Sequence, residues 1–203
     1  MSTVTFPGDG TLVSSANTPD TTVTFFQQIV AQQLGFDPVG SPATAFKAVR
    51  VAWQQTGQPA YTVTDDVCIL RATADDNEFS RVRDNLYQPH NSTSVTAAMG
   101  FTQTWTMHFV FYGPNAYDHA RQVVSAMSLD LFVQQIEAAN FYPVPDWRRP
   151  QYTKELFQGQ WWPRVDLDLK FNEEVSESLT VPIAASVEVI IVKENGYTSS
   201  ITV

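Results

Sequence analysis

The sequence has few of the residues that several kinds of binding site need. It contains a single cysteine, Cys68, among 203 residues, which excludes an internal disulfide and any cysteine-rich zinc site. Basic residues are also scarce, with 12 Lys and Arg against 21 Asp and Glu and a net charge of −9. Binding to DNA or to anionic lipid needs clustered basic residues, so we expect the protein to bind neither DNA nor anionic lipid.

Membrane and targeting signals are missing as well. The sequence has no apolar run of about 18 residues, the length of a membrane-spanning helix. Its first residues, MSTVTFPGDG, lack the basic and apolar regions of a signal peptide. We therefore expect a soluble protein that is made in the cytosol and has no membrane partner.

Motifs for phosphate, metal or nucleophile chemistry are absent too. There is no glycine-rich phosphate loop and no G-x-S-x-G turn. The three histidines, His90, His108 and His119, lack the H-x-x-x-H spacing of a zinc site. We therefore expect no catalytic residue, no metal and no cofactor, although a Ser-His-Asp triad stays open because its members need not be close in the sequence.

What the sequence does contain is the composition of one packed domain. Hydrophobic residues make up 43% of the chain and aromatic residues 12%, which is too much for a disordered chain. Apolar residues at helical spacing predict three helices, at about Thr22 to Leu34, Asn115 to Met127 and Leu129 to Asn140. Thr22 and Asn115 are the expected N-caps.

Alternating apolar and polar residues predict five strands. The strands are expected at Phe46 to Gln54, Val67 to Ala72, Val95 to Tyr112, Trp162 to Val175 and Ala184 to Val192, with the last two paired. Cys68 is expected as a buried residue of the second strand. Together these elements predict an α+β fold, with a mixed, mostly antiparallel sheet covered by about three helices.

The composition also divides the chain into segments. Residues 1–20 and 193–203 are rich in Ser, Thr, Gly and Pro, which predicts extended terminal arms that a partner would order. Residues 21–192 are expected to form the single domain. Within that domain, residues 73–94 are polar and without clear periodicity, which predicts a long loop or insertion.

The stretch FQGQWWPRVDLDLKFNEEV, residues 157–175, contains the first candidate site. Strand alternation directs Val165 and Leu167 inward and sends four charged residues outward: Arg164, Asp166, Asp168 and Lys170. Three interpretations stay open for these four residues. They form an exposed charge ladder, a strip of salt bridges between subunits, or, through Asp166 and Asp168, an acid/base or metal-binding pair.

The second candidate is a cluster of aromatic residues and arginines, which are types enriched at protein interfaces. Its members are Trp147, Arg148, Arg149, Tyr152, Trp161 and Trp162. Neighbouring residues of a strand point to opposite sides, so one of Trp161 and Trp162 is also expected to pack on the core. A stacking platform for nucleic acid is a further interpretation.

Several segments resemble one protein family, the tail terminator or neck terminator proteins of long-tailed bacteriophages. The resemblance runs from about residue 45 to residue 192, through 49–76, 109–121, the link ending in Arg149-Pro150, 155–172 and 181–189. Its specific parts are Tyr112-Gly113-Pro114 followed by Asn115, and Gly159-Gln160-Trp161-Trp162 followed by Arg164. The two arms match nothing in this family.

The resemblance implies a structural, non-enzymatic virion protein. Such a protein forms a ring, expected to be a hexamer, which terminates the tail and joins the tail tube to the head-side connector. DNA passes through a central channel without specific binding. The implied partners are other copies of the chain, the tail tube protein, the sheath if the tail is contractile, and a connector or stopper protein. The implied location is the neck of the virion, after synthesis in the host cytoplasm.

Two other hypotheses follow from the residues alone. The first is an adaptor outside any virus that binds an acidic or aromatic partner through Arg148, Arg149, Trp161 and Trp162. The second is a hydrolase that uses Asp166 and Asp168 with a nearby Glu, such as Glu173 or Glu174. In the ring hypothesis, the eight candidate interface residues are Arg148, Arg149, Trp161, Trp162, Arg164, Asp166, Asp168 and Lys170.

Overall fold

The protein is described by a computed structural model over residues 2–5, 11–52, 61–91, 94–157, 159–182, 188–192 and 198–202. The chain forms two compact units. We call Asn17–Val82 with Phe101–Glu174 the helical unit, and Met1–Ala16 with Arg83–Gly100 and Val175–Val203 the strand unit. Two long strands, β6 (Ser94–Tyr112) and β9 (Gln160–Pro182), contribute residues to both.

A mixed sheet forms the centre of the helical unit, in the order β9-β6-β4-β3. Strand β4 (Val67–Asp75) is antiparallel to β6, whereas the short β3 (Val49–Val51) is parallel to β4. Strands β7 (Phe141–Pro143) and β8 (Gln151–Phe157) both pair antiparallel with β9. The predicted α+β class with a mostly antiparallel sheet is confirmed.

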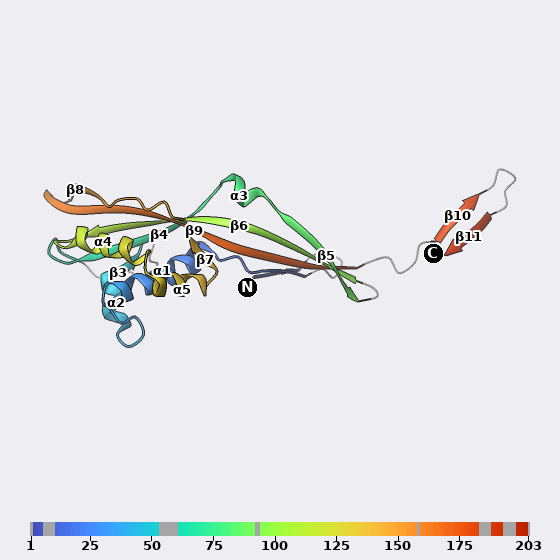
Figure 1. The fold of residues 1–203 in the computed structure, drawn as a ribbon, viewed down its shortest axis with the longest axis horizontal. Coiled ribbons are helices and arrows are strands. Elements are labelled where there is room, and N and C mark those ends of the chain that lie inside the picture. The colour runs from blue at the N-terminus through green and yellow to red at the C-terminus, as the bar shows by residue number, and fades with distance from the viewer. Residues whose placement is uncertain are drawn as a thin grey trace. The chain divides into compact units, whose positions relative to one another are not determined.

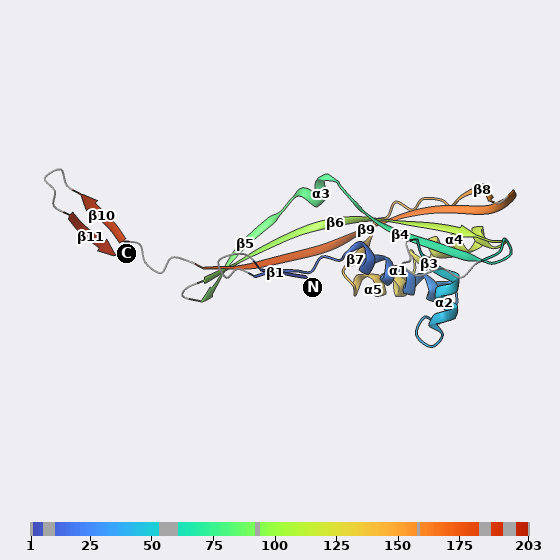
Figure 2. The same cartoon turned by 180° about the vertical axis from the view of Figure 1, so that it is seen from behind.

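Five helices accompany this sheet in the described part of the unit. They are α1 (Pro19–Gln33), α2 (Pro42–Ala48), α3 (Glu78–Arg81), α4 (Ala116–Ala126) and α5 (Asp130–Glu137). Helix α1 contacts β3, β4, α2 and α4, so these helices form one layer. Both views show α1, α2 and α5 on one side of β6, with α3 on the other (Figures 1 and 2).

The core lies between the sheet and this helical layer. Alternate residues of β6 and β9 are buried there: Trp105, Met107, Phe109, Phe111, Val165, Leu167, Leu169 and Phe171. Phe26 of α1 packs on the rings of Phe141 and Phe171, with centroids 5.4 and 4.5 Å away. Cys68 is buried on β4. The predicted inward positions of Val165 and Leu167 are therefore confirmed.

The first helix begins earlier than the sequence analysis predicts. Its N-cap is Thr18 and not Thr22, which is buried within the helix. The Thr18 hydroxyl accepts the backbone N–H of Thr21 at 3.2 Å, and the Thr21 hydroxyl accepts the N–H of Thr18 at 2.8 Å. Pro19 occupies the first turn, where its fixed φ suits a helix and its missing N–H costs nothing.

One further prediction about local structure is wrong. Phe46 to Ala48 end helix α2 instead of starting a strand, and the strand covers only Val49–Val51. Trp53, which was expected on the same strand, lies outside the described residues. Pro42 at the start of α2 explains the helix, because proline is favoured in a first turn.

The segment 73–94 is not the predicted long loop. Strand β4 continues to Asp75, α3 follows, and β5 (Asp84–Asn91) pairs antiparallel with β6. Its apolar residues Leu86 and Tyr87 point to opposite faces, and both are exposed. A strand with two exposed faces shows no alternation of apolar and polar residues, so periodicity alone cannot find it.

The strand unit contains three further antiparallel pairings. Strands β1 (Ser2–Thr5) and β2 (Thr11–Ser14) form a hairpin, and β2 pairs with β9 through Leu12↔Leu179. Strand β10 (Glu188–Val192) pairs with β11 (Thr198–Thr202). The predicted pairing of the 184–192 strand with the 162–175 strand is therefore wrong, because β10 pairs with β11, the next strand in the chain, and not with β9.

Candidate interaction surface

The sheet face turned away from the core carries a polar network that links three strands of the helical unit. Thr106 of β6 donates its hydroxyl hydrogen to Asp75 at 2.8 Å, and Lys170 of β9 forms an ion pair with the same carboxylate at 3.0 Å. Thr104 donates to Asn172 at 3.0 Å. Lys170 therefore points outward as predicted, but its anionic partner comes from β4.

Arg164 connects β9 with β8 on the same face. Its Nε donates to Asp166 at 2.8 Å and its Nη1 to Glu155 at 3.2 Å. The bond to Asp166 raises the pKa of Arg164. Tyr112 also donates to Glu155, at 2.7 Å. This bond, ahead of that from Arg164, lowers the pKa of Glu155, while burial and the same bond raise the pKa of Tyr112.

Asp168 has a histidine as its partner. Its Oδ1 lies 2.7 Å from Nδ1 of His108 on β6. Of the four outward residues, only Arg164 and Asp166 pair with each other. Arg164, Asp168 and Lys170 thus each bond to a neighbouring strand. A hollow of about 470 Å³ opens beside it, with His108, Asp166 and Asp168 among its lining residues.

The structure separates Glu173 from the two aspartates of the hydrolase hypothesis, whereas Glu174, the other glutamate of that hypothesis, is exposed. Asp166 and Asp168 lie on the outward face, whereas Glu173 is buried on the core side. Glu173 accepts bonds from the backbone N–H of Asn17 at 2.8 Å, the Asn17 amide at 2.7 Å and Trp105 Nε1 at 2.6 Å. It cannot act with the two aspartates, because a strand sends odd and even positions to opposite sides.

The described residues contain neither a metal-binding group nor a membrane-spanning helix. Within these ranges, no group of three or more His, Cys, Asp or Glu side chains is arranged to hold a metal ion. None of the helices in the same ranges is long and apolar enough to span a bilayer.

The two neighbouring tryptophans point to opposite sides, as predicted. Trp162 is half-buried and packs against the rings of Tyr61, Tyr112 and Phe157, with centroids 5.6, 6.4 and 5.5 Å away. Trp161 is 64% exposed. The turn before it contains Gly159 at φ +78°, a conformation that glycine adopts readily.

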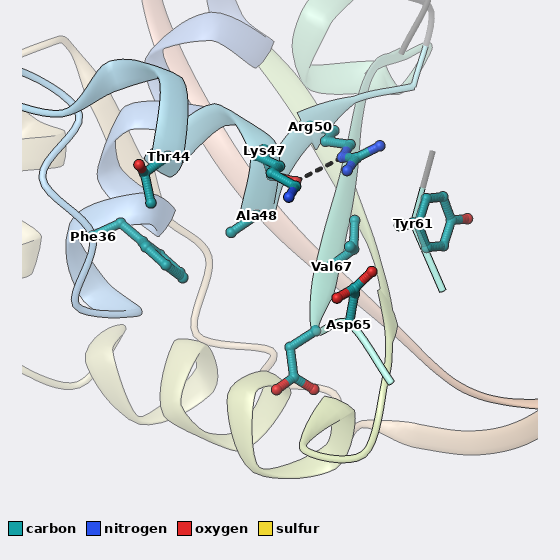
Figure 3. A pocket seen from close by; sticks show the side chains of 9 residues that line it. Phe36, Thr44, Lys47, Ala48, Arg50, Tyr61, Asp65 and Val67 are labelled. Atoms are coloured by element: carbon teal, nitrogen blue, oxygen red, sulfur yellow. Dashed lines mark hydrogen bonds between the residues drawn. The ribbon is translucent and has the colours of Figure 1, made fainter. Parts of the chain in front are cut away.

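Next to the Trp162 cluster is a hollow of about 200 Å³ (Figure 3). The buried Arg50 donates its Nε–H to the carbonyl of Lys47 at 2.7 Å, and its guanidinium lies 5.0 Å from the centre of the Tyr61 ring. Burial lowers the pKa of Arg50. Across the hollow, bonds from the backbone and side chain of Thr62 lower the pKa of Asp65.

Arg148 and Arg149 lie elsewhere, in a third hollow of about 300 Å³. Its lining includes Tyr117, Arg121, Trp147, Arg148, Arg149 and Pro150, and we call it the arginine hollow. Trp147 packs partly on the core. Within the described ranges, no ion pair or ring contact joins Arg148 or Arg149 to either Trp161 or Trp162. The predicted aromatic and arginine cluster is therefore divided between two places.

Comparison with protein families identifies the chain. A family model described as phage neck terminator protein matches residues 20–196. The chain belongs to the phage neck terminator family. No curated protein matches the sequence. The resemblance inferred from the motifs around Tyr112 and Trp161 is confirmed, and with it a structural role in the virion neck, in association with other phage proteins.

The neck terminator also exposes apolar side chains that the sequence analysis did not select. In the helical unit these are Val39, Phe79, Val82, Leu129, Leu131, Leu156 and Phe157, each more than half exposed. Where such groups lie close together, as Phe79 and Val82 do on one short turn, they form the kind of apolar patch that contacts other proteins. Phe79, an aromatic residue within a polar segment, was the available signal in the sequence.

Proposed function

We propose that this neck terminator forms a ring of identical subunits, expected to be a hexamer, which closes the phage tail and joins it to the head. The family match over residues 20–196 carries this proposal. The exposed apolar side chains support it, because each subunit of a ring buries such groups against its neighbours. The protein acts in this model as a structural component and not as an enzyme.

The outward face of β9 and the segments beyond the domain supply the contacts in this model. Arg164, Asp166, Asp168 and Lys170 lie at subunit or ring interfaces, as do Arg148, Arg149, Trp161 and Trp162. Residues 1–20 and 193–203 act as arms that reach neighbouring subunits, on either side of one domain at 21–192.

DNA passes through the centre of the proposed ring without specific binding. The net charge of −9 favours this role, because an acidic wall repels the phosphates of a passing duplex. The other proposed partners are the tail tube protein, the sheath if the tail is contractile, and the connector or stopper protein on the head side.

The test is to image particle necks and to complement phage that lack the gene. We expect cryo-electron microscopy to show a ring of this chain between tail tube and connector. Particles made without it should contain unjoined heads and tails, and the purified protein should restore joining. Normal, infectious particles without the protein would contradict the proposal, as would a single copy per neck.

A further inference from the structure

The segment Asp76–Val82, which we call the α3 turn, presents apolar side chains to solvent. Phe79 is 66% exposed and Val82 is 62% exposed. Glu78 is the neighbour of Phe79 in the sequence. Its carboxylate makes no ion pair with any of the described residues. An aromatic side chain beside an unpaired carboxylate is suited to a partner site that contains aromatic residues and cations.

The α3 turn is also held in one conformation. The side chain of Asn77 accepts the N–H of Ser80 at 2.9 Å, while the Ser80 hydroxyl accepts the N–H of Asn77 at 3.3 Å. Arg81 donates two hydrogen bonds to the carboxylate of Asp76, at 2.9 and 2.7 Å. Because the turn is already ordered, little conformational entropy is lost when Phe79 meets a partner.

The arginine hollow has the complementary chemistry. Its lining includes three arginines, Arg121, Arg148 and Arg149, together with the aromatic residues Tyr117 and Trp147. None of these three arginines forms an ion pair within the part of the chain that the structure describes. A hollow with three unpaired arginines, in a chain with only 12 basic residues, attracts a carboxylate and an aromatic ring.

We propose that the α3 turn of one copy binds in the arginine hollow of a second copy. Phe79 enters between Tyr117 and Trp147, and Glu78 pairs with Arg148 or Arg149. This inference rests on the proposed ring and names the surfaces through which neighbouring subunits meet.

The position of the two surfaces favours a head-to-tail contact. Helix α4, which contributes Tyr117 and Arg121, contacts α1 and so belongs to the helical layer. The α3 turn lies on the other side of β6 from α1, α2 and α5 (Figures 1 and 2). Two different patches on one subunit give a heterologous contact, which closes into a ring when the rotation between subunits permits.

Disulfide trapping in assembled particles tests this contact directly. The double variant Val82→Cys with Arg149→Cys keeps Phe79 and Glu78, and the natural Cys68 is only 1% exposed and does not compete. After mild oxidation of purified particles, we expect a ladder of covalently linked subunits from the double variant. Each single variant should remain a monomer under denaturing conditions.

Two trapping results would overturn the inference. One is a double variant that assembles into particles and stays monomeric after oxidation. The other is a link between position 149 and a different virion protein, since the hollow would then hold another partner.

A charge exchange provides an independent test with a matched control. Glu78→Arg and Arg149→Glu should each lower the phage titre at least about tenfold by placing like charges together. The combination of both changes should restore most of the titre. Glu137→Arg, at an exposed site on α5, should leave the titre unchanged. Full titre in both single variants would contradict the contact, as would reduced titre without rescue.

These results separate the contact from the ring itself. A ring seen in particles whose subunits do not link through positions 82 and 149 leaves the proposed function intact and refutes this contact. A neck with one copy of the chain refutes both.

Discussion

The buried carboxylate of Glu173 allows a quantitative test of how the helical unit is held together. Its side chain is 1% exposed and accepts three hydrogen bonds, two from Asn17 just before α1 and one from Trp105 on β6. Hydrogen bonds to a charged group contribute about 1.5–3 kcal/mol each to stability. Glu173 therefore fastens the start of the first helix to the sheet.

Glu173→Gln keeps the shape of the side chain but replaces one acceptor oxygen with an NH₂ donor. Whichever way the amide turns, this donor faces either the Trp105 N–H or the two N–H groups of Asn17. Because at least one buried donor then loses its acceptor, we expect the free energy of unfolding to fall by about 2–4 kcal/mol. Urea denaturation followed by circular dichroism measures this change.

Two further variants make the Glu173 test specific. Glu174→Gln changes the exposed neighbour and should shift the free energy of unfolding by less than about 0.5 kcal/mol. Trp105→Phe removes the indole donor. The double variant should therefore lose less free energy of unfolding than the sum of the losses in Trp105→Phe and Glu173→Gln. The reasoning fails if Glu173→Gln is as stable as Glu174→Gln, or if the double variant shows simple additivity.

Three other predictions concern single groups. Tyr112→Phe removes the main bond that lowers the pKa of Glu155, so NMR titration should find this pKa closer to its ordinary value; an unchanged pKa would contradict the assignment. In the wild type, that lowered pKa stabilises the fold above the ordinary pKa of a glutamate, and the contribution is lost as the pH falls through the folded value. Gly113→Ala places a Cβ 2.6 Å from a backbone carbonyl at φ +105°, so it should lower the free energy of unfolding by about 1–3 kcal/mol. Gly100→Ala, with nothing within 4 Å, should cost less in the same denaturation assay. Burial raises the pKa of Cys68, so a thiol reagent should label it only as the protein unfolds, and fast labelling of the native protein would show that the thiol is accessible.

The long strands could be predicted because burial gives them a strict period. The inward residues of the two strands alternate with polar ones. Strand β6 therefore lies where the sequence analysis expects it, whereas β9 continues past the expected end at Val175 to Pro182. At α1 and α2, local chemistry decides where the helix begins. In each case a proline at the helix start, Pro19 or Pro42, outweighed the pattern of the residues that follow.

The candidate surface was predictable in direction but not in its partners. The outward position of Lys170 follows from strand alternation alone. Its ion pair with Asp75 depends on the alignment of strands that are 95 residues apart in the sequence. Alternation within one strand contains no information about this register, so the network across β4, β6 and β9 could not be derived.

The division of the aromatic and arginine cluster has a geometric cause and a consequence for assembly. Arg149 precedes β8 and Trp161 follows it, and the seven residues of β8 extend the chain by roughly 23 Å at the rise of a strand. Residues that are close in the sequence thus belong to two surfaces: the arginine hollow beside α4 and the exposed tip of the β8–β9 hairpin. A subunit that meets only one neighbour needs one such surface. We expect two separate surfaces of this kind if the terminator uses one surface to contact its own copies and the second surface to contact a different neck or tail protein.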